Sequence, residues 1–303
     1  MIEIREAKLD DVGEIVKLYH EIWGDKYPYS DYINESEIER LIKEEECIWM
    51  LALEDNAIIG SGACVHNKWN NSTEFGRGVI KKEHRTKHHI ANLASKKLVD
   101  LAFERGFDVC WGTPRNRQVY YVVTNLGFST VGYMPGPYIV DFREIYLFAE
   151  KLSESGKKKR ITPVNKNEIY NLPLVKLING VFGLKDNPGG YPADSFVGDD
   201  AHQTGLIKLK YVCAHNTLFI LSSHNPAPKD IHYIEGDILI DKTETINLLK
   251  SAGFKITAYL PAWYGTDKRY DCVKMVRAFK EYNSYDEFIC NLKNKIEEAL
   301  KDG

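Results

Sequence analysis

A run of basic side chains at a predicted strand–helix junction is the feature of this chain best suited to chemistry. We predict a strand for residues 74–80 and an amphipathic helix for residues 91–104, where apolar residues recur at helical spacing. The junction between them is Lys81-Lys82-Glu83-His84-Arg85-Thr86-Lys87-His88-His89. The N-terminus of a helix offers unpaired N–H groups and the positive end of the helix dipole, and both attract phosphate. The junction therefore predicts a site for a phosphate-bearing cofactor; a solvated basic turn is the plainer alternative.

The segment from Val79 to Leu93 resembles the acyl-CoA-binding motif of the GNAT N-acetyltransferase superfamily. In that motif a strand, an Arg or Gln, a glycine-rich turn and a helix follow one another. Asn116, followed after ten residues by Gly127-Phe128, resembles the Asn…Leu-Gly-Phe stretch of the same family. The resemblance covers residues 2–148 in matching element order. It implies an N-acyltransferase that uses an acyl-CoA, most simply acetyl-CoA, as co-substrate.

The resemblance also implies which residues would bind the co-substrate. Val79 and Ile80 would bind the pantetheine arm through backbone groups, where the sheet splays apart. Asn116 would hydrogen-bond that arm or a water near it. The residues implied for the pyrophosphate are Arg85, Thr86, Lys87, His88, His89 and Ile90. The family has glycines at three of these positions, and glycine lets the backbone approach phosphate closely, so the side chains of this chain would narrow or reshape the pocket.

Catalytic roles follow from the same resemblance. Glu74 stands on the strand where many family members keep a general base, and a carboxylate there could take a proton from the attacking ammonium. The alternative for Glu74 is an exposed strand residue. The tyrosine that often serves as general acid is replaced here by Val123, so Tyr121 is the nearest candidate, beside Tyr120. Core packing is the more ordinary role for at least one of these tyrosines. Direct acyl transfer needs no covalent enzyme intermediate, so loss of one acid would lower the rate without abolishing the reaction.

Two adjacent histidines, His88 and His89, raise the question of a metal. Adjacent residues on a helix diverge by about 100°. No Cys, Asp or Glu stands at a ligand spacing from them. We therefore predict no metal site.

One phrase of the sequence occurs twice. Gly127-Phe128 is followed after four residues by Tyr133-Met134-Pro135, and Gly253-Phe254 is followed after four residues by Tyr259-Leu260-Pro261. Each copy follows a helix-like stretch and runs into a strand-like one. A recurrence of this kind is typical of a duplicated supersecondary unit.

The repeat and the length of 303 residues predict two related domains. Residues 1–152 would form a GNAT-like domain that binds acyl-CoA, and residues 160–303 a degenerate copy of it. The polar stretch from Ser153 to Arg160 is the predicted linker, a solvated basic segment. In the second half only residues 223–230 separate two predicted strands where the phosphate-binding helix would stand, so this half is not expected to bind CoA. Its expected work is structural.

Parts of the second half could also wall the acceptor site. The candidates are Trp263-Tyr264 and the loop Gly189-Gly190-Tyr191-Pro192. Packing in the core or between domains is the more ordinary role for such aromatic residues.

The elements expected along the chain define an α/β fold, a mixed and mostly antiparallel sheet flanked by helices. They include a hairpin from Cys47 to His66, a helix from Arg117 to Asn125 and a hairpin from Ser129 to Phe148. In the second half we expect a helix from Glu168 to Phe182, an irregular loop from Lys185 to Asp200, and a terminal helix from Asp286 to Leu300.

Composition excludes several classes of protein. The chain is 44% hydrophobic and 27% charged, with a net charge of −3, which argues against a dedicated nucleic-acid binder. Its six cysteines form no C-x-x-C pair and fit buried free thiols. There is no signal peptide and no apolar run near the roughly 18 residues of a membrane helix. We therefore expect a cytoplasmic protein with no membrane association, which could form a homodimer.

The leading hypothesis is an N-acetyltransferase that acts on a primary amine of a small molecule through a ternary complex. Two alternatives stay open. One is a non-catalytic, degenerate GNAT protein that binds acyl-CoA or a partner, which the missing glycines and Val123 would explain. The other is aminoacyl transfer from a charged tRNA, because Fem-like transferases also carry paired GNAT-like domains.

Overall fold

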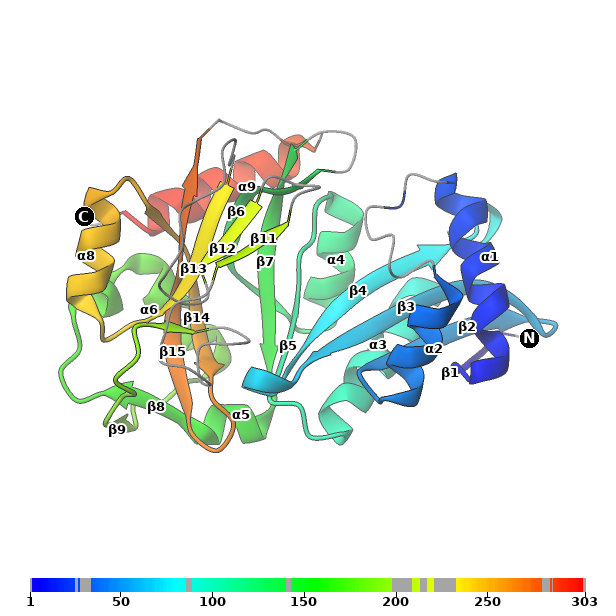
Figure 1. Ribbon diagram of the computed structural model, residues 1–303, viewed down its shortest axis with the longest axis horizontal. Coiled ribbons are helices and arrows are strands. Elements are labelled where there is room, and N and C mark those ends of the chain that lie inside the picture. Colours follow the sequence, from blue (N-terminus) through cyan, green and yellow to red (C-terminus); the bar gives the residue numbers. More distant parts are fainter. Residues whose placement is uncertain are drawn as a thin grey trace.

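The computed structural model describes residues 2–24, 27, 34–85, 89–139, 143–197, 209–212, 217–220, 233–279, 284 and 286–301. Figure 1 shows the first half of the chain on the right, in blue to green, and the second half on the left. The two halves meet where β6, β7 and β14 lie side by side.

The first half contains a sheet with helices on both faces. Its elements are β1 (Ile2–Glu6), α1 (Val12–Trp23), α2 (Glu35–Lys43), β2 (Cys47–Glu54), β3 (Ala57–Asn67), β4 (Ser72–Ile80), α3 (Ile90–Glu104), β5 (Val109–Gly112), α4 (Arg117–Asn125), β6 (Ser129–Ile139) and β7 (Arg143–Leu152).

The side chains of β2 alternate between the two faces of the sheet and show which helices cover each face. Trp49 and Leu51 pack with α1 and α2, whereas Ile48 and Met50 pack with α3 and α4. Because successive strand side chains point to opposite faces, the two helix pairs lie on opposite sides of the sheet. The predicted α/β fold with a mostly antiparallel sheet is confirmed.

The second half continues the same sheet. Its elements are α5 (Glu154–Lys159), β8 (Arg160–Pro163), α6 (Pro173–Phe182), β9 (Pro188–Gly189), β10 (Phe196–Val197), β11 (Leu209–Val212), β12 (Thr217–Ile220), β13 (Tyr233–Leu239), α8 (Thr243–Ser251), β14 (Lys255–Tyr264), β15 (Arg269–Ala278) and α9 (Glu287–Ala299). The strand order is β1-β2-β3-β4-β5-β7-β6-β14-β15-β13-β12-β11.

The predicted linker is wrong, because residues 153–160 are ordered and packed. Ser153 caps α5 by accepting a hydrogen bond from the N–H of Gly156. Gly156 is buried so close to the backbone of Asp108 that a Cβ there would lie 2.6 Å from the Asp108 carbonyl oxygen. Arg160 is 2% exposed and forms an ion pair with Asp271. A polar composition predicted solvent exposure throughout, but Lys159 and Arg160 pair with Asp108 and Asp271, far along the chain.

Two other expectations differ from the structure. The helix predicted from Glu168 to Phe182 is a 3-10 turn (Glu168–Asn171) followed by α6, which starts at Pro173. Proline fits the first turn of a helix because its missing N–H would have no partner there. The loop predicted as irregular, residues 185–200, contains the short strands β9 and β10 in its described part.

The two halves repeat each other without insertion over their last elements. The helix α4 starts at Arg117 and α8 at Thr243, β6 at Ser129 and β14 at Lys255, and β7 at Arg143 and β15 at Arg269, so every offset is 126 residues. The strand order is also palindromic about the β6–β14 junction, with β3-β4-β5-β7-β6 facing β14-β15-β13-β12-β11. These relations support the predicted duplication, while the domain boundaries at residues 152 and 160 stay a prediction.

At the junction a residue pairs with its own repeat equivalent. Gly132 of β6 lies opposite Ala258 of β14 in an antiparallel pair, and the two are 126 residues apart. A contact between equivalent residues is the mark of a two-fold axis. The close approach also requires the missing side chain, since a Cβ on Gly132 would lie 2.1 Å from that of Ala258.

Replacing Gly132 by alanine should therefore lower the urea midpoint of unfolding. The added methyl would also lie 2.4 Å from the carbonyl oxygen of Thr257, and overpacking of this kind costs about 1–3 kcal/mol. Gly180→Ala in α6 is the matched control, because an added Cβ there meets no described atom within 4 Å and alanine favours a helix interior. Equal stability of Gly132→Ala and the wild type would show that β6 and β14 do not approach so closely.

Candidate functional site

Only the beginning of β4 pairs with β5, which is a short strand. Their parallel pairing joins residues 72–74 to residues 109–111 and ends at Glu74 and Trp111. Beyond it β4 runs on to Ile80 paired with β3 alone, within the part of the chain that the structure describes. The edge of β4 that faces β5 is therefore open from residue 75 onward.

A β-bulge marks the point where β4 turns away. Gly62 of β3 lies opposite two residues of β4, Arg77 and Gly78, between the pairs Ser61–Val79 and Ala63–Gly76. Arg77 has the left-handed φ of 55°. An extra residue of this kind bends a strand and increases its twist. The space beside the bulge is empty, since a Cβ added to Gly76 or Gly78 would meet no described atom within 4 Å.

Glu74 stands at the start of this opening and is held by an ion pair. The Nη1 of Arg77 lies 2.9 Å from Oε1 of Glu74, and the two side chains are 6% and 18% exposed. The hydroxyl of Tyr19, from α1, donates a hydrogen bond to the carbonyl oxygen of Arg77. Burial raises the pKa of the Tyr19 hydroxyl, which keeps it a donor. Glu74 is thus not an exposed strand residue, and its role as a general base stays a prediction.

The basic junction after β4 is only partly described. Thr86, Lys87 and His88, three of the residues predicted to bind pyrophosphate, lie outside the described residues. The Nε of Arg85 donates to the carbonyl oxygen of Ile80 at 3.0 Å, which places the Arg85 guanidinium at the end of β4 and uses one of its five N–H groups.

The start of α3 has no side-chain cap. His89 precedes the helix with a φ of 51°, and its side chain caps no backbone N–H. Ile90 is the first helical residue, and its side chain is 2% exposed, packed with Ala52 and Ile59. Of the predicted pyrophosphate ligands, Ile90 could therefore offer only its backbone N–H.

Asn116 is placed at the N-terminus of α4, next to the end of β5. Its Oδ1 accepts a hydrogen bond from the N–H of Val119 at 2.9 Å, which is a helix cap. The first N–H of the helix, that of Arg117, donates to Oδ2 of Asp286 at 2.6 Å. The cap occupies one lone pair of Oδ1, and it does not use the amide nitrogen of Asn116.

The predicted catalytic Tyr121 lies on the outer side of α4 rather than beside Glu74. Its ring packs on Phe288 of α9, and its hydroxyl accepts a hydrogen bond from Nε of Arg117 at 3.3 Å. Tyr120 packs on the same phenylalanine. Val123, at the position where relatives of this fold often carry the acid, is 1% exposed in the core. The structure brings neither tyrosine into contact with Glu74.

A polar cluster that sequence reasoning missed lies between the end of α1 and the start of β7. Arg115 stands 3.4 Å from Oε2 of Glu144, and its Cζ lies 5.6 Å from the ring centre of Trp23. Burial, with the negative charge of Glu144, raises the pKa of Tyr146 to about 12. The only sequence signal is that Arg115 directly precedes Asn116.

An aromatic cluster covers the face of β5 on which Trp111 lies. Trp111 stacks on Phe148 with ring centres 5.2 Å apart, and Trp263 of the second half lies edge-on to both. Trp69 packs on Trp263 from the other side. Trp263 is 4% exposed, so it does not line an open surface. It packs against Trp111, the residue of β5 that pairs with Glu74.

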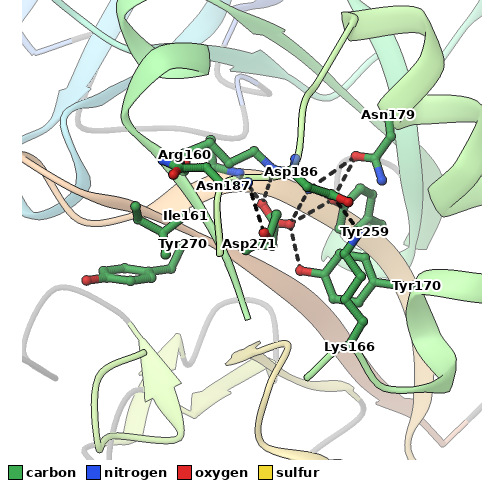
Figure 2. A network of polar contacts seen from close by, with 12 residues as sticks. Arg160, Ile161, Lys166, Tyr170, Asn179, Asp186, Asn187, Tyr259, Tyr270 and Asp271 are labelled. Carbon is green, nitrogen blue, oxygen red and sulfur yellow. Dashed lines mark hydrogen bonds and ion pairs between the residues drawn. The ribbon is translucent and has the colours of Figure 1, made fainter. Parts of the chain in front are cut away.

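The polar network of Figure 2 is structural. Its centre is the buried Asp271, whose carboxylate accepts hydrogen bonds from Arg160 (Nε 2.8 Å, Nη2 2.6 Å), from the hydroxyls of Tyr170 (2.8 Å) and Tyr259 (2.9 Å), and from the N–H of Ala262 (2.9 Å). Five donors use the lone pairs of one carboxylate completely. The Asp271 carboxylate thus links β8, β14 and β15 within the second half.

The described residues contain no cluster of three or more His, Cys, Asp or Glu arranged to hold a metal ion. The five cysteines that lie in described segments are free, four of them buried, as predicted. Among the described helices none is long and apolar enough to cross a membrane.

Comparison with known proteins agrees with this description. Residues 13–128 match the model of the Acetyltransferase (GNAT) family. This part of the chain is therefore a GNAT domain, and the predicted family is confirmed for the first half. No curated protein matches the chain.

Several solved structures are similar over half of this chain. A ribosomal-protein-S5-alanine acetyltransferase from Vibrio fischeri is 16% identical with a TM-score of 0.44, over 50% of this chain and 93% of that one. An acetyltransferase of the GNAT family from Streptococcus pneumoniae is 21% identical with a TM-score of 0.43, over 50% and 99%. A phosphinothricin acetyltransferase from Sinorhizobium meliloti, in complex with AcCoA, is 20% identical with a TM-score of 0.44, over 50% and 89%.

Glu150, on β7 beside Trp111, is a buried carboxyl group without a hydrogen-bond partner in the described structure. Burial, together with Asp237, raises its pKa well above the ordinary value, against the opposing charges of Arg269 and Lys274. The folded state therefore retains a proton that the unfolded chain has lost above about pH 4.5. Stability should fall as the pH rises from that value toward the pKa of the folded state.

Glu150→Gln should remove this pH dependence, because the amide is neutral at every pH. The urea midpoints of variant and wild type should be close at pH 4, and the variant should be the more stable at pH 8. Glu154→Gln, at an exposed position on α5, is the matched control and should follow the wild-type profile. Parallel profiles for Glu150→Gln and the wild type would show that Glu150 is charged in the folded state.

Proposed function

We propose that this chain is an acyl-CoA-dependent N-acyltransferase, with acetyl-CoA as co-substrate and a primary amine of a small molecule as acceptor. The observation that carries the proposal is the open edge of β4 beyond Glu74. Backbone N–H and C=O groups of a strand need partners, and the pairing of β4 with β5 ends at Glu74, well before β4 itself ends at Ile80. An extended ligand with amide groups, such as the pantetheine arm, suits an edge of this kind.

The surroundings of the edge fit the rest of such a co-substrate. His89 caps no N–H group of the first turn of α3 through its side chain, and Arg85 adds a guanidinium at the end of β4. Leu93 on the first turn of α3 and Val119 on the first turn of α4 are 51% and 40% exposed. Phosphate would be bound at the helix start, and the two exposed apolar side chains would contact the parts of the molecule that carry no charge.

Glu74 is the group suited to the proton transfer. Acyl transfer requires a neutral amine, since an ammonium has no lone pair, and a carboxylate near the attacking nitrogen removes the proton. Arg77 engages Oε1 of Glu74, so the proton would go to Oε2 or reach it through a water. The bound thioester supplies the acyl group and a leaving thiolate. Val123 cannot protonate that thiolate, and Tyr121 lies away from Glu74, so we propose no protein acid.

A second candidate function, acyl-CoA binding without catalysis, is favoured by that same missing acid. Turnover on amines distinguishes the two. Stabilisation by acetyl-CoA with no acetylated product from any amine would favour the binding protein. A rise in melting temperature with charged tRNA, and none with acetyl-CoA, would favour the aminoacyl-transfer alternative.

Arg85→Ala should weaken acetyl-CoA binding about tenfold or more. A charge-assisted hydrogen bond contributes about 1.5–3 kcal/mol, and each 1.4 kcal/mol is a factor of ten in affinity. Calorimetric titration measures the change. Arg105→Ala is the matched control, because Arg105 lies at the opposite end of α3 and pairs with Glu6. An affinity unchanged by Arg85→Ala would mean that the pyrophosphate binds elsewhere.

Glu74→Gln should lower kcat by about 100-fold or more, the contribution typical of a general base. The loss should be largest at low pH, where little of the amine is already neutral. The measurement is kcat against pH for wild type and variant, with acetyl-CoA affinity checked in parallel. A pH–rate profile of unaltered shape would remove Glu74 as the base.

A further inference from the structure

In the second half the strand equivalent to β5 is β13, and another segment of the chain pairs with it where its described pairing with β12 ends. The strand β13 pairs with β12 in parallel at residues 233–235. Further along, at residues 237 and 238, β13 pairs with β10. Because β15 occupies one edge of β13 along its whole length, β10 must lie on the other edge, the one that β12 leaves.

The 126-residue offset shows which position this is. Trp111 and Gly112, where β5 parts from β4, correspond to Asp237 and Ile238 of β13. Val197 of β10 lies opposite Asp237, and Phe196 lies opposite Ile238. The strand β10 therefore lies beside the equivalents of the last two residues of β5, of which Trp111 still pairs with Glu74 in the first half and Gly112 lies beyond that pairing.

The equivalent of Asn116 supports the same conclusion. Asn116, the residue proposed to bind the pantetheine arm, corresponds to Lys242. The ammonium of Lys242 donates a hydrogen bond to the carbonyl oxygen of Pro192, in the segment that leads into β10. In one half this position faces a slot for an amide-bearing ligand, and in the other half it binds a peptide carbonyl.

Further contacts anchor the segment from Tyr191 to Val197. The N–H of Leu239 donates to the carbonyl oxygen of Ser195 at 2.9 Å, and the hydroxyl of Thr245 donates to that of Ser195 at 3.1 Å. The Tyr191 hydroxyl donates to the carbonyl oxygen of Ile161 at 3.1 Å. Val197 is 1% exposed. The segment is thus packed into the fold as a permanent part of it.

We infer that residues 191–197 occupy the second half's cofactor slot as an internal substitute for a pantetheine arm, so that the chain binds one acyl-CoA and not two. The inference rests on the proposed function for the first half. Both occupants present amide groups to a strand edge. A segment of the same chain is always present at a high effective concentration, so free CoA cannot compete with it.

The first test is the stoichiometry of CoA binding to the full chain. We expect one CoA per chain by calorimetric titration and by native mass spectrometry at saturating CoA. Two bound CoA molecules per chain would overturn the inference. No bound CoA at all would overturn the proposed function and leave the filled slot to be judged by the exchange measurement below.

Two equivalent positions provide a matched pair of variants. Asn116→Asp keeps an oxygen for the helix cap but loses the amide donor, so CoA affinity should fall severalfold. Lys242→Ala should leave CoA affinity unchanged and lower the melting temperature, because it releases the carbonyl of Pro192. The opposite pattern, with affinity lost only in Lys242→Ala, would mean that the second half is the binding half and would overturn the inference.

Hydrogen exchange tests the filled slot without any ligand. The amide of Leu239 should exchange slowly, because its partner is the carbonyl of Ser195, and Lys242→Ala should speed that exchange. The amide of Leu260, in the pair with Cys272 in the neighbouring strands, is the internal reference. Exchange at Leu239 as fast as in an unstructured peptide would show that β10 does not pair with β13.

Discussion

The bulge in β4 is the constraint on which the candidate site depends, because it turns the strand away from β5 and leaves an edge without a partner. A left-handed φ at a residue other than glycine costs about 1–3 kcal/mol and persists only where its surroundings enforce it. At Arg77 the surroundings hold both the backbone and the side chain. Tyr19 donates to its carbonyl oxygen, and Glu74 pairs with its guanidinium. The candidate base and the bulge are therefore one unit, and the opening exists because Glu74, Arg77 and Tyr19 lie together.

The second half contains another left-handed residue, in β14, that different groups hold in place. Ala262 has a φ of 51° at an irregularity in β14. Its N–H donates to Asp271 and its carbonyl oxygen accepts from Arg269. Arg269 also pairs with the buried Asp108, at the start of β5. Replacing a buried ion pair by apolar groups changes stability little, whereas removing one partner is costly. These charges therefore fix geometry, and they place Trp263 against Trp111 beside the proposed acyl-transfer site.

Local signals made much of the fold predictable. The bounds of α4 were predicted to the residue because Asn116 is a strong cap and Gly127 a strong stop, and both act within one turn of the helix. The hairpin of β2 and β3 follows from apolar runs around a short turn. The linker was mispredicted because the partner of Arg160 is Asp271, 111 residues away. Polar composition alone cannot reveal a pairing over that distance.

The site was predictable only in outline for the same reason. The resemblance placed the co-substrate at the β4–α3 junction, but it did not predict the ion pair of Glu74 with Arg77. That ion pair depends on a bulge, and no residue type in β4 predicts the bulge. Tyr121 was placed near the site because it lies close along the chain to Val123, where the resemblance expects the acid. The direction of its side chain is set by α9, whose Phe288 packs on its ring. A helix shows which residues share a face, while the elements that cover each face come from distant parts of the chain.

The difference between the halves is itself an argument about function. Unpaired strand edges are a liability, and folded proteins usually cover them. In the second half β10 covers part of the edge of β13, the strand equivalent to β5. In the first half no described strand takes that place beside β5, and a Cβ on Gly76 or Gly78 of β4 would meet no described atom within 4 Å. This difference between the halves supports the proposal that the opening of the first half binds a ligand. In that proposal the ligand presents an extended chain of hydrogen-bonding groups, as β10 does, and a pantetheine arm has that form.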